Sequence, residues 1–256
     1  MLQTAPQFQV SLARSDDDIR AAQKLRYAVF VAELGGDGAA VDHNQALETD
    51  HFDSHADHLL LRDLRAPDSA TDGVIGVYRL MTEKHAKSAG RFYSAAEFDL
   101  SALLASGKSL LELGRTCLHP DHRGGAALMA LWQGVADYVA DHEIDILFGT
   151  ASFHGTDQPA LQNAISHLHT AYLVPDPLRV TSLMQTQPPL LPAAQIDRKA
   201  AMRDTPALIK SYLKLGGAIG QGVFVDHAFN TTDVCMILEI AKLSPGQLNR
   251  TARPTS

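Results

Sequence analysis

The sequence predicts an α/β (α+β) fold in which helices flank a mixed, mostly antiparallel central sheet. Three observations predict it. Apolar and polar residues alternate, or form short apolar runs, in several stretches of strand length. Longer stretches repeat apolar residues at helical spacing, and the two kinds of stretch follow one another along the 256 residues.

The N-terminal half begins with a predicted strand at residues 8–14 and a helix that starts after Ser15. The three aspartates that follow Ser15 are an N-cap signal, because acids stabilise the positive end of the helix dipole. Gly35 is expected to end this helix. Residues 37–56 are polar and are expected to form a mobile loop. A strand pair then follows at residues 57–64 and 73–82.

The predicted central strand of the sheet, "SLLELGRTCL", lies at residues 109–118. A helix and a buried strand are expected next, at residues 124–143 and 144–153. A short helix at 100–107 precedes them, and the later elements are helices at 157–173 and 206–216 and strands at 222–229 and 233–240. We expect one domain over residues 1–245, with an irregular insertion at 174–205 and a disordered tail at 246–256.

Composition and charge exclude several classes of protein. The formal net charge is −7 and no sustained run of Lys and Arg occurs, which argues against a nucleic-acid binder. The two cysteines, Cys117 and Cys235, stand in apolar runs, which favours a reducing compartment over a disulfide framework. No stretch reaches the roughly 20 apolar residues of a membrane span. We expect a cytoplasmic protein and leave open a peripheral contact with the inner face of the membrane.

A turn that could bind an anion follows the central strand. The sequence "HPDHRGG" leads directly into the next predicted helix, whose N-terminal N–H groups and dipole favour negative charge. It resembles the acyl-CoA loop of the GNAT superfamily of acetyltransferases, with fewer glycines, and this resemblance implies a GNAT-like fold. A donor with a single phosphate, such as the phosphopantetheine arm of acyl carrier protein, fits such a loop. The implied phosphopantetheine-binding residues are Arg123, Gly124 and Gly125.

A second pattern is a set of charged residues spread along the chain. Its members, in order, are Arg26 and Phe30 in "LRYAVF", Asp50 and Asp53 in "TDHFD", Arg79 in "VYRL", and Glu112 and Arg115 in "ELGR". The ordered set resembles the acyl-homoserine-lactone synthases, where matching residues surround the acceptor. Those synthases carry a Trp shortly after the Phe. This chain has Gly35 and Gly36 there, which argues against S-adenosylmethionine as the substrate.

The most extensive resemblance is to the ornithine lipid N-acyltransferases. It rests on "LRYAVFVAELGG", "ELGRTCLHPDHRGG", "LWQG" and "FNTTDV", and it reaches from about residue 10 to residue 240. It implies transfer of a 3-hydroxyacyl group from acyl carrier protein to the α-amine of L-ornithine, giving lyso-ornithine lipid without a metal or another cofactor. Alternatives left open are glutamine or glycine as acceptor, an acyl-homoserine-lactone synthase, and a non-catalytic module that binds acylated carrier protein.

The proposed chemistry requires a proton acceptor for the attacking amine. Glu112 is the predicted base, because a partly buried carboxylate can have a raised pKa. Glu112 and Arg115 would point to opposite faces of a regular strand, so we expect a bulge or splay at Gly114 to bring both toward the acceptor. Partners for these charges are expected in Arg26, Asp50, Asp53 and Arg79. The resemblance implies that these four residues and Phe30 bind the acceptor. The alternative is that Glu112 and Arg115 form only a structural ion pair.

Other residues invite weaker interpretations. His51, His55 and His58 alternate with aspartates and could bind a metal, although a loop is the expected setting. Cys117 could be a nucleophile, but a small apolar strand residue is the favoured interpretation. The segment that contains Asp226, His227 and Asp233 could hold a catalytic pair, or simply hydrogen bonds across a hairpin.

Overall fold

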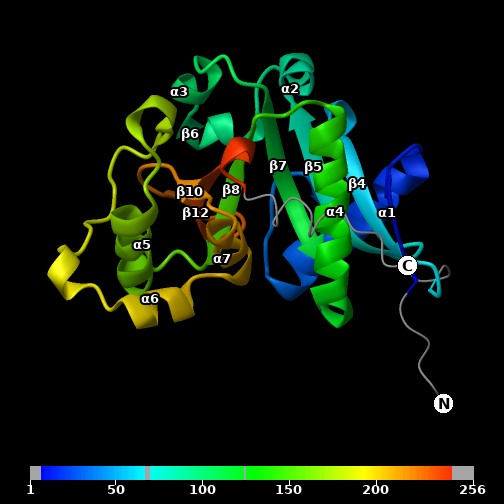
Figure 1. Ribbon diagram of the computed structural model, residues 1–256. Coiled ribbons are helices and arrows are strands. Elements are labelled where there is room, and N and C mark those ends of the chain that lie inside the picture. Colours follow the sequence, from blue (N-terminus) through cyan, green and yellow to red (C-terminus); the bar gives the residue numbers. More distant parts are fainter. Residues whose placement is uncertain (1–6, 67–69, 124, 244–256) are drawn as a thin grey trace. The chain divides into compact units, whose positions relative to one another are not determined.

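The computed structural model describes residues 7–66, 70–123 and 125–243, and the chain forms two compact units (Figure 1). The first unit contains the residues up to Gly90 together with Leu113–Glu143. The second contains Arg91–Glu112 and the described residues from Ile144 onward. The predicted tail at 246–256 lies outside the described residues, and the expectation of one continuous domain stays a prediction.

The first unit is built on strands that hydrogen-bond in the order β1-β4-β5-β7. The pairs β1–β4 and β4–β5 are antiparallel, and a register shift falls between Leu61 and Arg62 of β4. The strands are β1 (Phe8–Leu12), β4 (Asp57–Asp63), β5 (Val74–Thr82) and β7 (Leu110–Leu118), with the short β2 (Val41–Asp42) and β3 (Leu47–Glu48) paired separately. Its helices are α1 (Asp16–Arg26), α2 (Glu83–Ala89) and α4 (Gly125–Asp141), with single turns at Asp53–His55 and Pro120–His122.

Helix α1 begins as the sequence predicts. The hydroxyl of Ser15 accepts a hydrogen bond from the amide of Asp18, and three aspartates occupy the first turn. The helical segment continues without a break as a π-helix over Tyr27–Glu33, which the sequence does not predict. In this segment the amide of Leu34 reaches back five residues to the carbonyl of Val29, at 3.1 Å. Gly35 then ends the helical segment with a φ of 77°.

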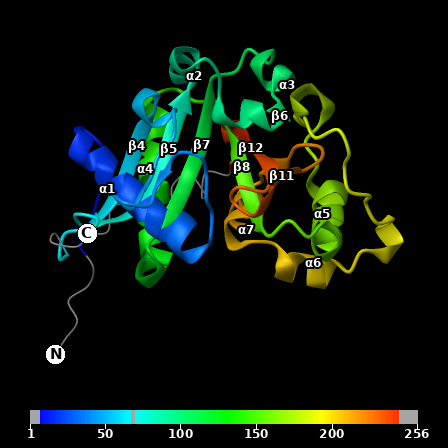
Figure 2. The same ribbon diagram turned by 180° about the vertical axis from the view of Figure 1, so that it is seen from behind.

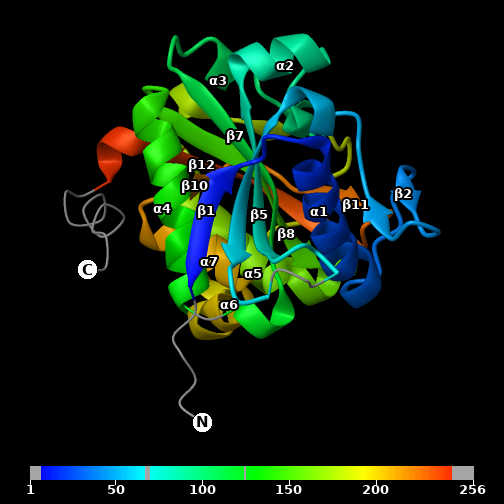
Figure 3. The ribbon, with the colours of Figure 1, turned by 90° about the vertical axis from the view of Figure 1, so that its right-hand side faces the viewer.

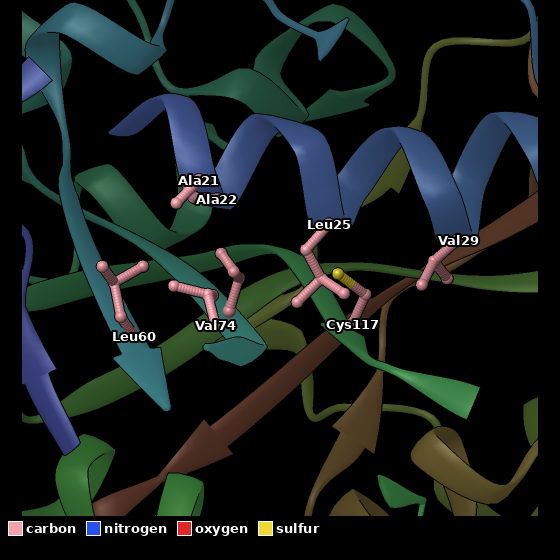
Figure 4. Packing of buried hydrophobic residues seen from close by; sticks show 8 residues of the cluster. Ala21, Ala22, Leu25, Val29, Leu60, Val74 and Cys117 are labelled. Carbon is pink, nitrogen blue, oxygen red and sulfur yellow. The ribbon is translucent and has the colours of Figure 1, made fainter. Parts of the chain in front are cut away.

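Two helices cover opposite faces of the first unit's strands, as Figure 3 shows for α1 and α4. Alternating residues of β4 separate the two interfaces, because successive strand side chains point to opposite faces. Leu60 packs in the α1 cluster, whereas Leu59 faces α4 at Gly134. Figure 4 shows α1 resting on that cluster, whose buried members are Ala21, Ala22, Leu25, Val29, Leu60, Val74, Val77 and Cys117.

The first residues of β7, Leu110–Glu112, belong to the second unit and pair with β8. The strands of this unit hydrogen-bond in the order β7-β8-β12-β10, with β11 also paired to β12. The pair β7–β8 is parallel, and the pairs that β12 forms are antiparallel. The strands are β6 (Phe98–Asp99), β8 (Ile146–His154), β9 (Thr181–Ser182), β10 (Ala218–Ile219), β11 (Phe224–Asp226) and β12 (Thr231–Glu239). The helices are α3 (Ser101–Leu104), α5 (Gln158–Tyr172), α6 (Arg198–Asp204) and α7 (Ala207–Lys214), with 3-10 turns at Tyr93–Ala96, Asp176–Leu178, Ala193–Gln195 and Ile240–Lys242.

The predicted fold class is confirmed, since helices flank mostly antiparallel strands in a mixed α/β arrangement. Figure 2 shows the strands of each unit from behind, with α5 and α6 side by side in the second. Three differences from the sequence analysis stand out: α2 was not predicted, β11 is only three residues long, and the irregular segment 174–205 contains α6. None of the helices in the described part of the chain combines the length and the apolar composition that a membrane crossing requires.

Gly134 provides a test of the packing between α4 and the strands. A Cβ at this position would lie 2.5 Å from Val10 Cγ1 and 3.0 Å from Leu59 Cδ2. We expect Gly134→Ala to lower the free energy of unfolding by about 1–3 kcal/mol, although alanine favours helices, because overpacking outweighs helix propensity. Denaturant titration measures this change. The control is Gly125→Ala on the same helix, where nothing lies within 4 Å, and a more stable Gly134→Ala protein would contradict the packing.

Candidate functional site

Six charged side chains of the first unit form a closed ring of ion pairs. The ring alternates in sign and returns to its starting residue, so each arginine bridges two carboxylates. Its members, in order, are Arg26, Glu48, Arg115, Asp50, Arg79 and Asp53. We call this group the ion-pair ring. Three positive and three negative charges balance, which is the condition under which charges survive burial.

The contacts of the ring are short and directional. Arg26 Nε donates to Glu48, and Arg26 Nη1 donates to Asp53 Oδ1 at 2.7 Å. Arg115 donates from Nε to Glu48 Oε1 at 3.1 Å, and its Nη2 lies 2.9 Å from Asp50 Oδ2. Arg79 Nη1 donates to Asp50 Oδ1 at 2.6 Å and to Asp53 Oδ1 at 3.3 Å. Charge-assisted hydrogen bonds of this kind are stronger than neutral ones.

Different elements supply the ring residues. Arg26 is the last residue of α1, Glu48 lies in β3, Arg79 in β5 and Arg115 in β7. Asp50 and Asp53 lie on the turn after β3, where the amide of Phe52 donates to Asp50 Oδ1 at 2.8 Å. The ring therefore fastens the segment 47–53 to a helix and two strands.

Three members of the ring have pKa values shifted toward their charged forms. Burial opposes ionisation of Asp50, but Arg79 and Arg115 outweigh it and hold the pKa of this carboxyl below its ordinary value. Burial likewise opposes ionisation of Asp53, and Arg26 is the main group that lowers its pKa. Burial would lower the pKa of Arg26, yet Glu48 and Asp53 raise it. All three shifts favour the ionised forms and hence the ring.

The backbone is irregular where Arg115 joins the ring. Arg115 has a φ of 49°, which is the left-handed region that a non-glycine residue enters at a cost of about 1–3 kcal/mol. The expected irregularity at Gly114 thus lies one residue further along β7. The ion pairs of Arg115 with Glu48 and Asp50 offset this backbone strain.

Five of the seven predicted acceptor-site residues meet in this ring: Arg26, Asp50, Asp53, Arg79 and Arg115. Phe30 is partly buried and packs against the hydrophobic cluster beneath α1. Glu112 lies in the second unit, where its carboxylate accepts hydrogen bonds from the amides of Tyr93 and Ser94 at 2.8 and 2.7 Å, and from the Ser94 hydroxyl. These donors fix the orientation of the Glu112 carboxylate.

Glu48 is the ring residue that sequence analysis missed. It is 1 % exposed, although it stands in a polar stretch that the sequence predicts to be a mobile loop. That prediction is wrong for Leu47–Asp53, because Leu47, Glu48, Phe52 and Asp53 are all buried. Charge counting offered no signal, because the predicted set already balanced its three arginines with Asp50, Asp53 and Glu112.

Arg123 lies between the 3-10 turn that follows β7 and the first residue of α4. Its Nη1 and Nη2 each lie 2.6 Å from an oxygen of Glu33, and its Nε donates to the carbonyl of Leu118 at 3.3 Å. Gly125 is the first residue of α4 and is exposed, whereas Gly124 lies outside the described residues. The side chain of Arg123 is 45% exposed and can be reached by a ligand.

The alternative sites have structural explanations. His51, His55 and His58 each hydrogen-bond a protein atom: the carbonyl of Ala89, the hydroxyl of Ser88 and the carbonyl of Asp53. Complete burial raises the pKa of the Cys117 thiol to about 12, which leaves it protonated and disfavours a role as nucleophile.

A separate group of carboxylates in the second unit could hold a cation. Glu97, Asp226 and Asp233 offer oxygens that lie within 4.8 Å of one another, and oxygen ligands suit Ca²⁺ or Mg²⁺. One oxygen of Asp226 already accepts hydrogen bonds from the amides of Ala228 and Phe229, at 2.8 and 3.1 Å. Asp226 is thereby accounted for as a turn residue, and we assign no metal to this group.

Comparison with known proteins identifies relatives across almost the whole chain. A family described as an acetyltransferase (GNAT) domain matches residues 25–133. An L-ornithine N(alpha)-acyltransferase from Rhodobacter capsulatus is 51% identical over 93% of this chain and 92% of its own length. A protein of the same name from Brucella abortus is 40% identical over 93% of this chain and 86% of its own length.

Solved structures share the fold at low sequence identity. FeeM, an N-acyl amino acid synthase from uncultured soil microbes, superposes with a TM-score of 0.52 at 13% identity, over 93% of each chain. BjaI, a CoA-dependent acyl-homoserine lactone synthase, gives a TM-score of 0.54 at 12% identity, over 97% of this chain and 92% of its own. At such identity these structures support the fold alone, which agrees with the GNAT family match.

The ring predicts a large effect of removing Glu48. Glu48→Gln leaves two arginines with a neutral partner in a buried position, so we expect the free energy of unfolding to fall by about 3–5 kcal/mol. The control is Asp176→Asn, which removes the exposed partner of Arg179 and should change stability by less than about 1 kcal/mol. Denaturant titration compares the two, and equal effects would contradict a role of the ring in holding the fold.

Proposed function

The chain belongs to the family of L-ornithine N(alpha)-acyltransferases and is an acyltransferase, and on this premise we propose that it acylates the α-amino group of L-ornithine. The proposed donor is a 3-hydroxyacyl group on acyl carrier protein, and the product is lyso-ornithine lipid. The family relationship supports the acceptor. The resemblance of "HPDHRGG" to an acyl-donor loop with few glycines supports acyl carrier protein as the donor, and the resemblance to the ornithine lipid N-acyltransferases implies the 3-hydroxyacyl group.

The observation that carries this proposal is the uneven exposure of the ion-pair ring. The side chains of Arg115 and Asp50 are 12% and 15% exposed, whereas those of Arg26, Glu48, Asp53 and Arg79 are at most 6% exposed. A zwitterionic amino acid can therefore meet one arginine and one carboxylate at the same edge. We assign Arg115 to the α-carboxylate and Asp50 to the α-amine of the acceptor.

The proposed reaction is attack of the neutral α-amine on the thioester carbonyl. A C–N bond forms, the tetrahedral intermediate collapses, and the C–S bond breaks to release the pantetheine thiol. The amine loses one proton, which the thiolate finally gains. The thioester is already activated, so the reaction needs no metal or redox cofactor, and positioning of the two reactants supplies much of the rate.

The four buried members of the ring have a positioning role in this scheme. Arg26, Glu48, Asp53 and Arg79 fix the side chains of Arg115 and Asp50, so that the acceptor meets a rigid pair of charges rather than two mobile ones. A preorganised pair loses little side-chain entropy when the acceptor binds. The amphiphilic product would leave toward lipid, and we include peripheral contact with the inner membrane face in the proposal.

An assay with defined acceptors tests the proposed function. Purified protein is incubated with 3-hydroxyacyl carrier protein and, separately, with ornithine, glutamine, glycine or S-adenosylmethionine, and products are identified by mass spectrometry. We expect Nα-acylated ornithine as the main product. Preferential acylation of glutamine or glycine would overturn the acceptor, and acyl-homoserine lactone would favour the synthase alternative. Donor binding without any product would favour a non-catalytic module.

The role of Glu112 as proton acceptor is tested separately. If Glu112 takes the proton, directly or through water, Glu112→Gln should lower kcat by about 10²- to 10⁴-fold while leaving donor binding intact. The control is Ser94→Ala, which removes one hydrogen bond to this carboxylate but keeps the carboxylate itself. Both variants can disturb the turn at Tyr93–Ala96. The folded fraction of each protein is therefore measured by thermal unfolding, and kcat is divided by this fraction. Equal kcat in the two variants would show that Glu112 only stabilises the turn and does not take the proton.

A further inference from the structure

The contact between Glu33 and Arg123 occupies the guanidinium that the resemblance to an acyl-donor loop assigns to the phosphate of the donor. Both terminal nitrogens of Arg123 lie 2.6 Å from the two oxygens of Glu33, in a bidentate pair. The remaining nitrogen, Nε, donates to the carbonyl of Leu118. In this arrangement each nitrogen of the guanidinium already has an acceptor.

A carboxylate and a phosphate compete for the same face of an arginine. Both present two oxygens that match the planar fork of the guanidinium. The pair is also accessible, since the side chains of Arg123 and Glu33 are 45% and 33% exposed. An exposed ion pair is worth little, typically about 0–1 kcal/mol, so a ligand with further contacts can displace it.

Glu33 stays ionised while it holds Arg123. The hydrogen bonds from Arg123 lower the pKa of the Glu33 carboxyl, and the same contact raises the pKa of Arg123. A fixed negative charge at this place therefore faces any anion that approaches the guanidinium. It repels small anions that make no other contact, whereas a pantetheine arm gains contacts beyond the phosphate.

We propose that Glu33 is a positioning residue of the donor site that holds Arg123 and is exchanged for the phosphate of the donor. This inference rests on the proposed function, because it takes Arg123 to contact that phosphate. Glu33 lowers the affinity of Arg123 for anions. Free phosphate then binds too weakly to replace Glu33, whereas a donor that makes additional contacts can replace it.

The location of Glu33 supports this role. It is the last residue of the π-helix Tyr27–Glu33, and π-helical segments occur frequently at functional sites. Arg26, the residue directly before this segment, belongs to the ion-pair ring. One short segment thus directly follows a positioning residue of the ion-pair ring and ends at the residue that holds Arg123, within the same unit.

Binding of 4′-phosphopantetheine and of inorganic phosphate, measured by calorimetry, tests the inference. Glu33→Gln should bind both about five- to tenfold more tightly than the unaltered protein, because the competing carboxylate and its repulsion are gone. The increase should be proportionally larger for inorganic phosphate at low salt, and the KM for ornithine should stay unchanged. The control is Glu83→Gln, which removes the same charge from an exposed residue of α2 and should leave both affinities unchanged.

A double-mutant cycle separates this inference from the proposed function. Arg123→Gln should weaken phosphopantetheine binding. Adding Glu33→Gln to it should strengthen binding by less than Glu33→Gln does in the unaltered protein, because only the repulsion is then removed. If Arg123→Gln weakens binding but Glu33→Gln does not strengthen it, Glu33 has no gating role and the donor assignment stands. If Arg123→Gln leaves phosphopantetheine binding unchanged, Arg123 does not bind the phosphate, and both the donor assignment and this inference fail.

Discussion

The closed ring of alternating arginines and carboxylates is the constraint on which the first unit depends. Six ionised groups can leave bulk water together only if each finds partners of opposite sign, and the ring gives every member two. The same pairing fixes the polar segment 47–53 against α1, β5 and β7. A part of the chain that would otherwise be a loop therefore becomes a rigid wall of the candidate site.

The ring also explains an unfavourable backbone conformation. Arg115 holds a left-handed φ inside a strand, which a non-glycine residue adopts only where other interactions determine it. The ion pairs with Glu48 and Asp50 stabilise this conformation, and they hold the guanidinium at the least buried edge of the ring. Strain, charge and exposure thus coincide at one residue, which is typical of a group that binds a ligand rather than of one that only stabilises a core.

Local patterns in the sequence predicted much of this structure, and the failures have physical causes. The cap at Ser15 fixed the start of α1, and the apolar run around Leu113 marked β7, because both signals depend on near neighbours in the sequence. Glu48 was missed because its partners, Arg26 and Arg115, lie 22 and 67 residues away. The π-helix was missed because its residues suit an α-helix equally well. The grouping of five ring residues came from a family resemblance, since no periodicity links them.

The π-helix offers a physical reason why the donor side can adjust to its ligand without disturbing the acceptor residues. A π-helical turn is less stable than an α-helical one and persists where surrounding contacts require it. Arg26 is tied to Glu48 and Asp53 just before this segment, and Glu33 is tied to Arg123 at its end. Release of Glu33 by a phosphate would remove one of these two restraints. The ion-pair ring would then be the remaining charged anchor of the segment, so the acceptor edge at Arg115 and Asp50 would keep its geometry while the donor side adjusts to its ligand.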